Sequence, residues 1–286
     1  MKIILLANGT KKDVLEAVAR LRPEIERCAE IVGSDFSGKE DFSHVKADLA
    51  LVFGGDGSIL RAAAQLGTNQ IPVLAVHFGT LSFLSTVRSD ELVPLLMRPD
   101  LLKLPVLEHL LLRCDLYRKR YQKNPKLAPG TLEVTSFALN EVWLQGDNMA
   151  RLTSLELYID DELVTTYRGD GLLVATPVGS TAHNLSAGGP ILRKDIDAVV
   201  ISPVSPHTLS NRPLVESPDR KFEIRVRQRA VLIVDGQEIA RVHPGDSVCV
   251  TRAESTFKTP AVPGYSYYRT LRNKLGWNGS FTEDKS

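Results

Sequence analysis

The chain has few cysteines and almost no net charge. Cys28, Cys114 and Cys249 are its three cysteines among 286 residues. Their odd number and wide spacing fit neither a disulfide framework nor a zinc site. We therefore expect buried thiols in a reducing cytosol, and so a cytoplasmic protein. A formal net charge of +1 provides no global field that would favour nucleic acid or a membrane surface.

Long apolar runs and several familiar motifs are also missing. No run approaches the roughly 20 residues that cross a bilayer, and the first apolar stretch ends at Asn8-Gly9-Thr10, too soon for a signal sequence. The chain has no Gly-x-x-x-x-Gly-Lys-Ser/Thr, no Gly-x-Gly-x-x-Gly after a strand and no Gly-x-Ser-x-Gly. These absences argue against P-loop chemistry, the standard dinucleotide fingerprint and the hydrolase elbow.

The first third of the chain alternates apolar strands with helices. Strands are predicted at 2–7, 49–53 and 71–76, and helices at 11–30, 59–66 and 89–97. Continuous apolar strands alternating with helices predict a parallel sheet covered on both faces, and so an α/β domain over residues 1–100.

Beyond residue 100 short strands dominate. We predict them at 108–118, 133–144, 153–159, 163–167, 171–175, 198–201, 222–227, 231–234 and 247–252. Such spacing predicts a β-rich, sandwich-like domain over residues 101–267. Residues 122–130 form a predicted mobile loop, 267–275 a helix and 278–286 a frayed tail.

The segment Gly54-Gly55-Asp56-Gly57-Ser58 lies between a predicted strand and a predicted helix. Glycine lets backbone approach a phosphate closely, and the N–H groups that open a helix favour anions. A carboxylate beside phosphates is repelled unless it shares a metal ion or accepts a proton from the hydroxyl being phosphorylated. The alternative is an ordinary turn in which Asp56 caps the next helix, and this short motif alone does not decide between them.

Other segments carry candidate chemistry. The adjacent amide and carboxylate of Asn140 and Glu141 suit a diol, although a strand end explains them as well. The segment 176–190 is too rich in glycine and hydroxyls to pack by itself, and in it Thr181, Asn184 and Ser186 can bond to a base or a ribose. For His207 a structural role is the better interpretation, and Asp235-Gly236 is a hairpin signal.

Taken together, these segments resemble the NAD kinase family. The matches are GGDGS at 54–58, PVLAVHFGTLSFL at 72–84, NEVWL at 140–144, RGDGLLVATPVGSTAHNLSAGGPI at 168–191, PHTLSNRPLV at 206–215 and VDGQ at 234–237. They cover most of the chain. The segments at 168–191 and 206–215 are far more specific than GGDG, which lipid kinases and phosphofructokinases share. The resemblance implies that the first domain is a Rossmann-like α/β domain, that the second is β-rich, and that residues 268–286 return to the first. It also implies an active site between the domains and near a subunit interface of a homodimer or homotetramer.

The same resemblance implies transfer of the γ-phosphoryl group of ATP, with polyphosphate as another donor in some members, to the 2′-hydroxyl of the adenosine ribose of NAD. Mg²⁺ would accompany ATP, and no resident metal site of the protein is expected. Asp56 matches the catalytic residue. The implied nucleotide-binding residues are Gly57, Arg61, Phe83, Asn140, Glu141, Arg151, Arg168, Asp170, Thr181, Ala182, His183, Ser186 and Gln237.

The chain departs from the family pattern in places. His183 stands where the family has Tyr, His77 and Ser82 where many members have Asn and Gly, and Val178 where Thr or Ser is usual. Two other hypotheses therefore stay open. One is a kinase that uses the GGDG architecture on a lipid or sugar, and the other is a catalytically silent nucleotide-binding regulator. Preferences between ATP and polyphosphate, or NAD and NADH, do not follow from the sequence.

Overall fold

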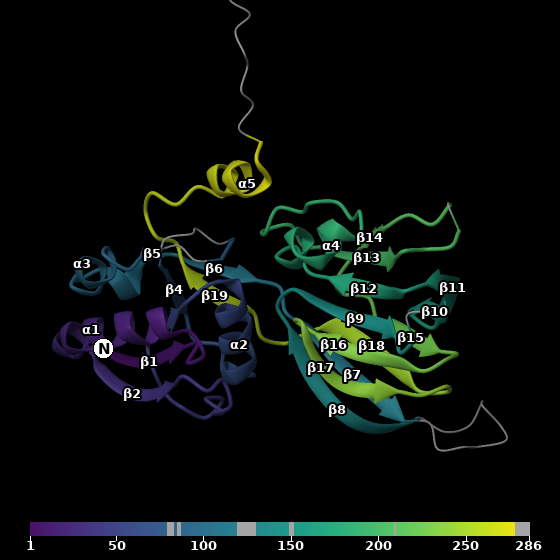
Figure 1. Ribbon diagram of the computed structural model, residues 1–286, viewed down its shortest axis with the longest axis horizontal. Coiled ribbons are helices and arrows are strands. Elements are labelled where there is room, and N and C mark those ends of the chain that lie inside the picture. Colours follow the sequence, from purple (N-terminus) through teal and green to yellow (C-terminus); the bar gives the residue numbers. More distant parts are fainter. Residues whose placement is uncertain (79–82, 85–86, 119–129, 149–151, 209, 278–286) are drawn as a thin grey trace, which may run out of the picture. The chain divides into compact units, whose positions relative to one another are not determined.

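The computed structural model describes residues 1–78, 83–84, 87–118, 130–148, 152–208 and 210–277. The chain divides into two compact units (Figure 1). The first comprises Met1–Leu107 and the chain from Lys258 onward, and the second comprises Glu108–Phe257. The predicted loop at 122–130, apart from Gly130, and the predicted tail at 278–286 lie outside the described residues.

The first unit is built on a five-stranded parallel sheet in the order β2-β1-β3-β4-β5. Its strands are β1 (Lys2–Ala7), β2 (Glu30–Asp35), β3 (Leu49–Phe53), β4 (Val73–His77) and β5 (Val87–Arg88). Its helices are α1 (Lys12–Cys28), α2 (Asp56–Leu66), α3 (Leu92–Leu96), a 3₁₀ turn at Leu101–Lys103 and α5 (Tyr267–Leu275).

The sheet of this unit is covered on both faces. Alternate side chains of β1, β3 and β4 share one core cluster with the apolar faces of α1 and α3. The intervening side chains, such as Ile4 and Val52, are also fully buried. Helix α2 contacts β1 and β3 and contributes the buried Ile59 and Leu66. This two-sided burial explains why β3 and β4 are apolar at almost every position.

The second unit contains two six-stranded antiparallel sheets. One has the order β11-β10-β15-β18-β7-β8 and the other β14-β13-β12-β9-β16-β17. The bounds are β7 (Leu112–Arg118), β8 (Thr131–Ala138), β9 (Glu141–Gly146), β10 (Thr153–Ile159), β11 (Glu162–Gly169), β12 (Gly171–Ala175), a 3₁₀ turn (Gly179–Thr181), α4 (His183–Ser186), β13 (Val199–Val204), β14 (Leu214–Glu216), β15 (Phe222–Val226), β16 (Ala230–Val234), β17 (Gln237–Val242) and β18 (Ser247–Arg252).

One hydrophobic core joins these two sheets. Leu116 and Ile224 come from the first sheet and Leu144 and Val174 from the second, and all four belong to a single buried cluster. The second unit is therefore a β-sandwich. Together with the parallel sheet of the first unit, it confirms the predicted fold class.

The chain leaves and re-enters the first unit through a two-stranded sheet of β6 (Val106–His109) and β19 (Phe257–Pro260). Within the described part of the chain, no helix is long and apolar enough to cross a membrane.

Two differences from the predicted elements matter for the site. Residues 30–35 form β2, whereas the helical pattern was extended to residue 30 and no strand was predicted there. The single strand predicted at 133–144 is two strands, β8 and β9, which separate at Leu139 and Asn140.

Candidate functional site

Asp56 is the first residue of α2 and follows β3 at the carboxyl end of the parallel sheet. The turn that leads to it depends on Gly54, whose φ of +139° is open to glycine and strained for other residues. A Cβ at Gly54 would also lie 2.3 Å from Oγ of Ser58. Gly54 therefore fixes the turn that presents Asp56 at the edge where such sheets bind ligands.

The carboxylate of Asp56 is held by two backbone N–H groups. The N–H of Phe83 donates to Oδ2 at 3.3 Å, and the N–H of Leu84 donates to Oδ1 at 3.0 Å. By contrast, a Cβ added at Gly55 or Gly57 would meet nothing within 4 Å. The backbone on both sides of Asp56 is thus open to a ligand, while the carboxylate itself is oriented.

A second structured loop follows β2 at the same edge of the sheet. Asp35 accepts hydrogen bonds from the backbone N–H groups of Ser37, Gly38 and Lys39 and from Nε2 of Gln65. Burial opposes ionisation, but the hydrogen bonds outweigh it and hold the pKa of Asp35 well below its usual range. Asp35 is therefore a charged anchor for the loop.

Arg61, a half-buried residue of α2, lies against this loop. A Cβ added at Gly38, which has a φ of +76°, would lie 2.1 Å from Cδ of Arg61. The guanidinium of Arg61 thus belongs to the same edge of the sheet as Asp56, and its charge suits a phosphate there.

In the second unit, Asp235 organises the chain between β8 and β9. Its carboxylate accepts hydrogen bonds from three successive backbone N–H groups, those of Leu139 (2.8 Å), Asn140 (2.8 Å) and Glu141 (3.1 Å). Asp235 occupies the turn between β16 and β17 with a φ of +49°. This long-range anchor separates the two strands and presents Asn140 and Glu141 as an adjacent pair.

Glu141 is 4% exposed, and its Oε2 is buried without a hydrogen-bond partner. Its Oε1 lies 3.3 Å from Nδ1 of His183, which is exposed on α4. Burial, with the charge of Asp235 as a second cause, raises the pKa of Glu141 to about 8. Burial likewise raises the pKa of Asp235 to about 6, although its three backbone hydrogen bonds oppose the shift. Glu141 is therefore largely protonated at neutral pH and can both donate to and accept from a ligand hydroxyl.

Trp143 adds an aromatic surface beside this carboxyl group. Its ring lies 5.0 Å from the ring of His183 at an interplanar angle of 41°. Its Nε1 is buried and has no partner, and a Cβ at Gly171 would come within 2.6 Å of it. The two rings and the free carboxyl oxygen together favour a ligand with a flat ring and hydroxyl groups.

The segment 176–190 is fastened to the Asn140 backbone and to its own core. Gly179 passes so close to Asn140 that an added Cβ would lie 2.1 Å from the Asn140 carbonyl oxygen. Asn184 is fully buried; its amide donates to the carbonyls of Ser180 and Pro190 (both 3.1 Å) and accepts from Oγ of Ser202 (2.7 Å). Asn184 therefore supports the loop, rather than pointing at a ligand as the sequence suggested.

The other predicted site residues differ in exposure. Thr181 and Ala182 are half-buried, whereas Ser186, Arg168, Asp170 and Gln237 are exposed. Arg151 lies outside the described residues. The structure brings Asn140, Glu141 and His183 together in the second unit, and Asp56, Gly57 and Phe83 together in the first.

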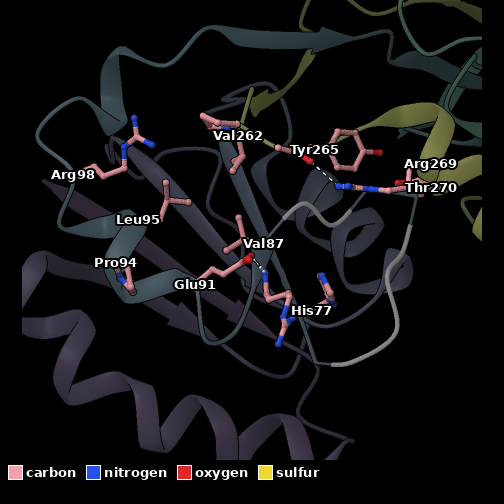
Figure 2. Close-up of a pocket in the computed structure, with 13 residues that line it drawn as sticks. His77, Val87, Glu91, Pro94, Leu95, Arg98, Val262, Tyr265, Arg269 and Thr270 are labelled. Atoms are coloured by element: carbon pink, nitrogen blue, oxygen red, sulfur yellow. Dashed lines mark hydrogen bonds between the residues drawn. The ribbon is translucent and has the colours of Figure 1, made fainter.

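The first unit also contains a cavity of about 540 Å³ (Figure 2). Arg98, Leu95 and Pro94 lie at one end, and Tyr265, Arg269 and Thr270 at the other. Among the described residues, no group of three or more His, Cys, Asp or Glu side chains is placed to hold a metal ion.

Two residues of the site had no assigned role in the sequence analysis. Trp143 lies inside NEVWL, where a tryptophan is also an ordinary strand residue. Asp235 was interpreted as a hairpin residue, which it is. Asp235 lies about 95 positions after residues 139–141, so no local sequence pattern indicates that they are in contact.

Comparisons with known proteins agree with these observations. A family model described as the ATP-NAD kinase N-terminal domain matches residues 6–98, and one described as the ATP-NAD kinase C-terminal domain matches residues 139–262. An NAD kinase from Rhodopirellula baltica is 43% identical over 284 residues, which are 97% of this chain and 87% of that protein. An NAD kinase from Geotalea daltonii is 35% identical over 262 residues, 90% and 88% of the two chains.

Solved structures show the same fold. The crystal structure of yeast NADH kinase complexed with NADH has a TM-score of 0.83 and 25% identity, and the match covers 100% of this chain and 90% of that one. An NAD kinase from Archaeoglobus fulgidus in complex with ATP has a TM-score of 0.69 and 24% identity, with 96% and 98% coverage.

Proposed function

Because this chain belongs to the NAD kinase family, we propose that it transfers the γ-phosphoryl group of ATP to the 2′-hydroxyl of the adenosine ribose of NAD, making NADP and ADP. The observation that carries the proposal is Asp56, placed at the carboxyl end of β3 with both oxygens held by backbone N–H groups. An oriented carboxylate at this position can orient the acceptor hydroxyl or take its proton.

In the first unit, the edge around Asp56 would receive MgATP. The open backbone at Gly55 and Gly57 and the N-terminus of α2 favour phosphate oxygens, and Arg61 adds positive charge nearby. Mg²⁺ arriving on the phosphates would offset their repulsion from Asp56. Polyphosphate offers the same oxygens and is the alternative donor.

In the second unit, the pair Asn140 and Glu141 would bind hydroxyl groups of NAD. The protonated Glu141 can donate to one hydroxyl while Asn140 both donates and accepts. His183 and Trp143 would pack against a ring of the dinucleotide. The further nucleotide contacts that we propose are Phe83 in the first unit and, in the second, Thr181, Ala182, Ser186, Arg168, Asp170, Arg151 and Gln237.

The chemical step forms a bond from the ribose 2′-oxygen to the γ-phosphorus and breaks the bond to the bridging oxygen, so that ADP leaves. The hydroxyl proton passes to Asp56 or to solvent. Because the transition state is loose, positioning and charge neutralisation supply most of the acceleration. Asp56 therefore has two candidate roles: it accepts the proton, or it orients the hydroxyl.

The test is a coupled NADP-formation assay with the full chain and its Asp56→Asn variant. We expect turnover with NAD and MgATP, and a loss of about 10²- to 10⁴-fold in kcat in the variant. Asp13→Asn, an exposed aspartate in the first turn of α1, is the matched control and should keep wild-type activity. Turnover within a few fold of wild type in a folded Asp56→Asn protein would exclude the proposed role.

Parallel reactions, each followed through its own phosphorylated product, separate the remaining hypotheses. Polyphosphate replaces ATP in one arm, and NADH, diacylglycerol or a sugar replaces NAD in others. Phosphorylation of a lipid or sugar in preference to NAD would indicate the related kinase class. Calorimetric binding of NAD without phosphoryl transfer would instead indicate a silent regulator.

We further propose a cytoplasmic homodimer or homotetramer. The three cysteines are free, which fits a reducing compartment. Light scattering coupled to size-exclusion chromatography would give the mass of the assembly, and a single chain of 31.5 kDa would contradict the oligomer.

A further inference from the structure

The orientation of Asp56 depends on two backbone amides far along the chain. Phe83 and Leu84 lie 27 and 28 residues after Asp56, and each donates its N–H to one carboxylate oxygen. A shift of these two amides would therefore rotate the carboxylate. The position of Phe83 and Leu84 is thus part of the site geometry.

Tyr265 holds this pair of residues from the C-terminal part of the chain. Its hydroxyl donates to the carbonyl oxygen of Phe83 at 3.1 Å, across 182 residues of sequence. Phe83 therefore donates its N–H to Asp56 and accepts at its carbonyl from Tyr265. The two hydrogen bonds form a chain from Tyr265 through one residue of backbone to the carboxylate.

Tyr265 is itself fixed by a tight turn and the start of α5. Gly264 has a φ of +85°, and the guanidinium of Arg269 donates to its carbonyl at 2.6 Å. Ser266 caps α5 by accepting from the N–H of Arg269, and the buried Thr270 bonds back to the Ser266 carbonyl. Figure 2 shows Tyr265, Arg269 and Thr270 grouped at one end of the cavity.

The hydroxyl of Tyr265 remains a donor over the working pH range. Burial raises the pKa of Tyr265, a hydrogen bond with Thr270 opposes the shift, and the negative charge of Asp56 adds to it. The charge of Asp56, at the start of α2, thus favours the neutral hydroxyl that donates.

We infer that Tyr265 is a positioning residue for Asp56, acting through the backbone of Phe83 and Leu84. This inference rests on the proposed kinase function only where it predicts an effect of Tyr265 on the rate of phosphoryl transfer. Tyr265 need not touch a substrate: loss of its hydroxyl would leave the binding groups in place while the carboxylate lost its fixed direction. Small misplacements of this kind reduce turnover more than they reduce affinity.

The kinetic test compares Tyr265→Phe with Tyr268→Phe, which removes the hydroxyl of an exposed tyrosine on α5, three residues further along the chain. We expect Tyr265→Phe to lower kcat about 10-fold with the KM for ATP within 2-fold of wild type, and Tyr268→Phe to match wild type. In an Asp56→Asn background, Tyr265→Phe should cost less than 2-fold, because both changes act on one group. A full 10-fold loss in that background, or a change in KM alone, would overturn the inference.

A second measurement does not depend on activity. Hydrogen exchange of the Phe83 and Leu84 amides should speed up about 10-fold in Tyr265→Phe and stay unchanged in Tyr268→Phe. Unchanged exchange at these amides in a folded Tyr265→Phe protein would refute the positioning role of Tyr265, even where wild-type protein made NADP. Faster exchange in a protein that makes no NADP would support the positioning role and reject the proposed function.

Discussion

Asp235 and Asp56 both accept hydrogen bonds from successive backbone N–H groups, with different consequences. Asp235 uses its carboxylate to fix the backbone of residues 139–141. Asp56 reverses the relation, since the amides of Phe83 and Leu84 fix the carboxylate and the glycines beside it leave space. The first is a support and the second is a candidate catalytic group.

Substitution of Gly57 tests whether the ATP phosphates need open space beside Asp56. It lies inside α2, has no positive φ and has open space where a Cβ would point. Gly57→Ala should therefore keep or raise the free energy of unfolding, by up to about 1 kcal/mol, because alanine is the better helix former. The added methyl group should hinder phosphate approach, and we expect kcat/KM for ATP to fall at least 10-fold in steady-state assays.

The control for Gly57→Ala is Ala64→Gly, at an exposed position of the same helix. It should lower the free energy of unfolding by about 1 kcal/mol and leave kcat/KM unchanged. If Gly57→Ala were as active as wild type, close phosphate approach at this glycine would be excluded.

The buried carboxyl of Glu141 predicts a specific pH dependence of stability. Its pKa is raised to about 8 in the folded chain, above the ordinary value of 4.5, so the unfolded state releases the proton first. Stability from Glu141 is thus complete below pH 4.5 and is lost as the pH rises through about 8. The corresponding loss of stability from Asp235, whose pKa in the folded chain is about 6, is nearly complete by pH 6.5. Between pH 6.5 and 8.5 we expect wild type to lose roughly 1 to 2 kcal/mol relative to Glu141→Gln.

Urea unfolding of both proteins across this pH window provides the measurement. Glu162→Gln, at an exposed position at the start of β11, should follow the wild-type curve. Parallel curves for wild type and Glu141→Gln would mean that Glu141 ionises normally in the folded protein.

At the scale of elements, the sequence predicted those whose pattern is local. The strands at 2–7 and 49–53 and the helix at 267–275 have the predicted bounds, because apolar runs and helical spacing carry them. The strand at 30–35 was missed because its residues are only partly buried and include a glycine. The break between β8 and β9 was missed because Asp235, from a distant hairpin, causes it.

The loop at 176–190 is another segment whose contacts its local sequence pattern did not indicate, and one of these contacts gives a prediction. Its small polar residues suggested a ligand site, but the amide of Asn184 is used within the fold. Asn184→Ala should lower the free energy of unfolding by about 2 to 4 kcal/mol, because it leaves Ser202 and two carbonyls without their partner. Chemical denaturation would measure this loss.

Ser186 is the matched comparison, since it lies exposed on the same short helix. Ser186→Ala should change the free energy of unfolding by less than about 0.5 kcal/mol and raise the KM for NAD. Equal destabilisation by the two variants would show that the loop is not held through Asn184.

At the scale of the whole molecule, the sequence separated an α/β half from a β-rich half because their periodicities differ. It did not predict the strand order of either sheet, since pairing such as β9 with β12 and β16 joins segments far apart in sequence. The same non-local pairing brings residues 139–141, 183 and 235 together. The division of labour between the two units, with ATP in one and NAD in the other, remains a prediction.

Hydrogen exchange with one ligand at a time tests that division in the full chain. NAD alone should slow exchange at residues 139–146 and 176–190, because Asn140, Glu141 and the loop beside them are its proposed contacts. A non-hydrolysable MgATP analogue alone should slow exchange at residues 35–40 and 54–61, where backbone amides and Arg61 form the proposed phosphate edge. Each protection should fade in the variant that removes its own contact, Glu141→Ala for NAD and Gly57→Ala for the analogue, while the other persists. Protection of 54–61 by NAD alone, with none at 139–146, would contradict the assignment of the two substrates to the two units.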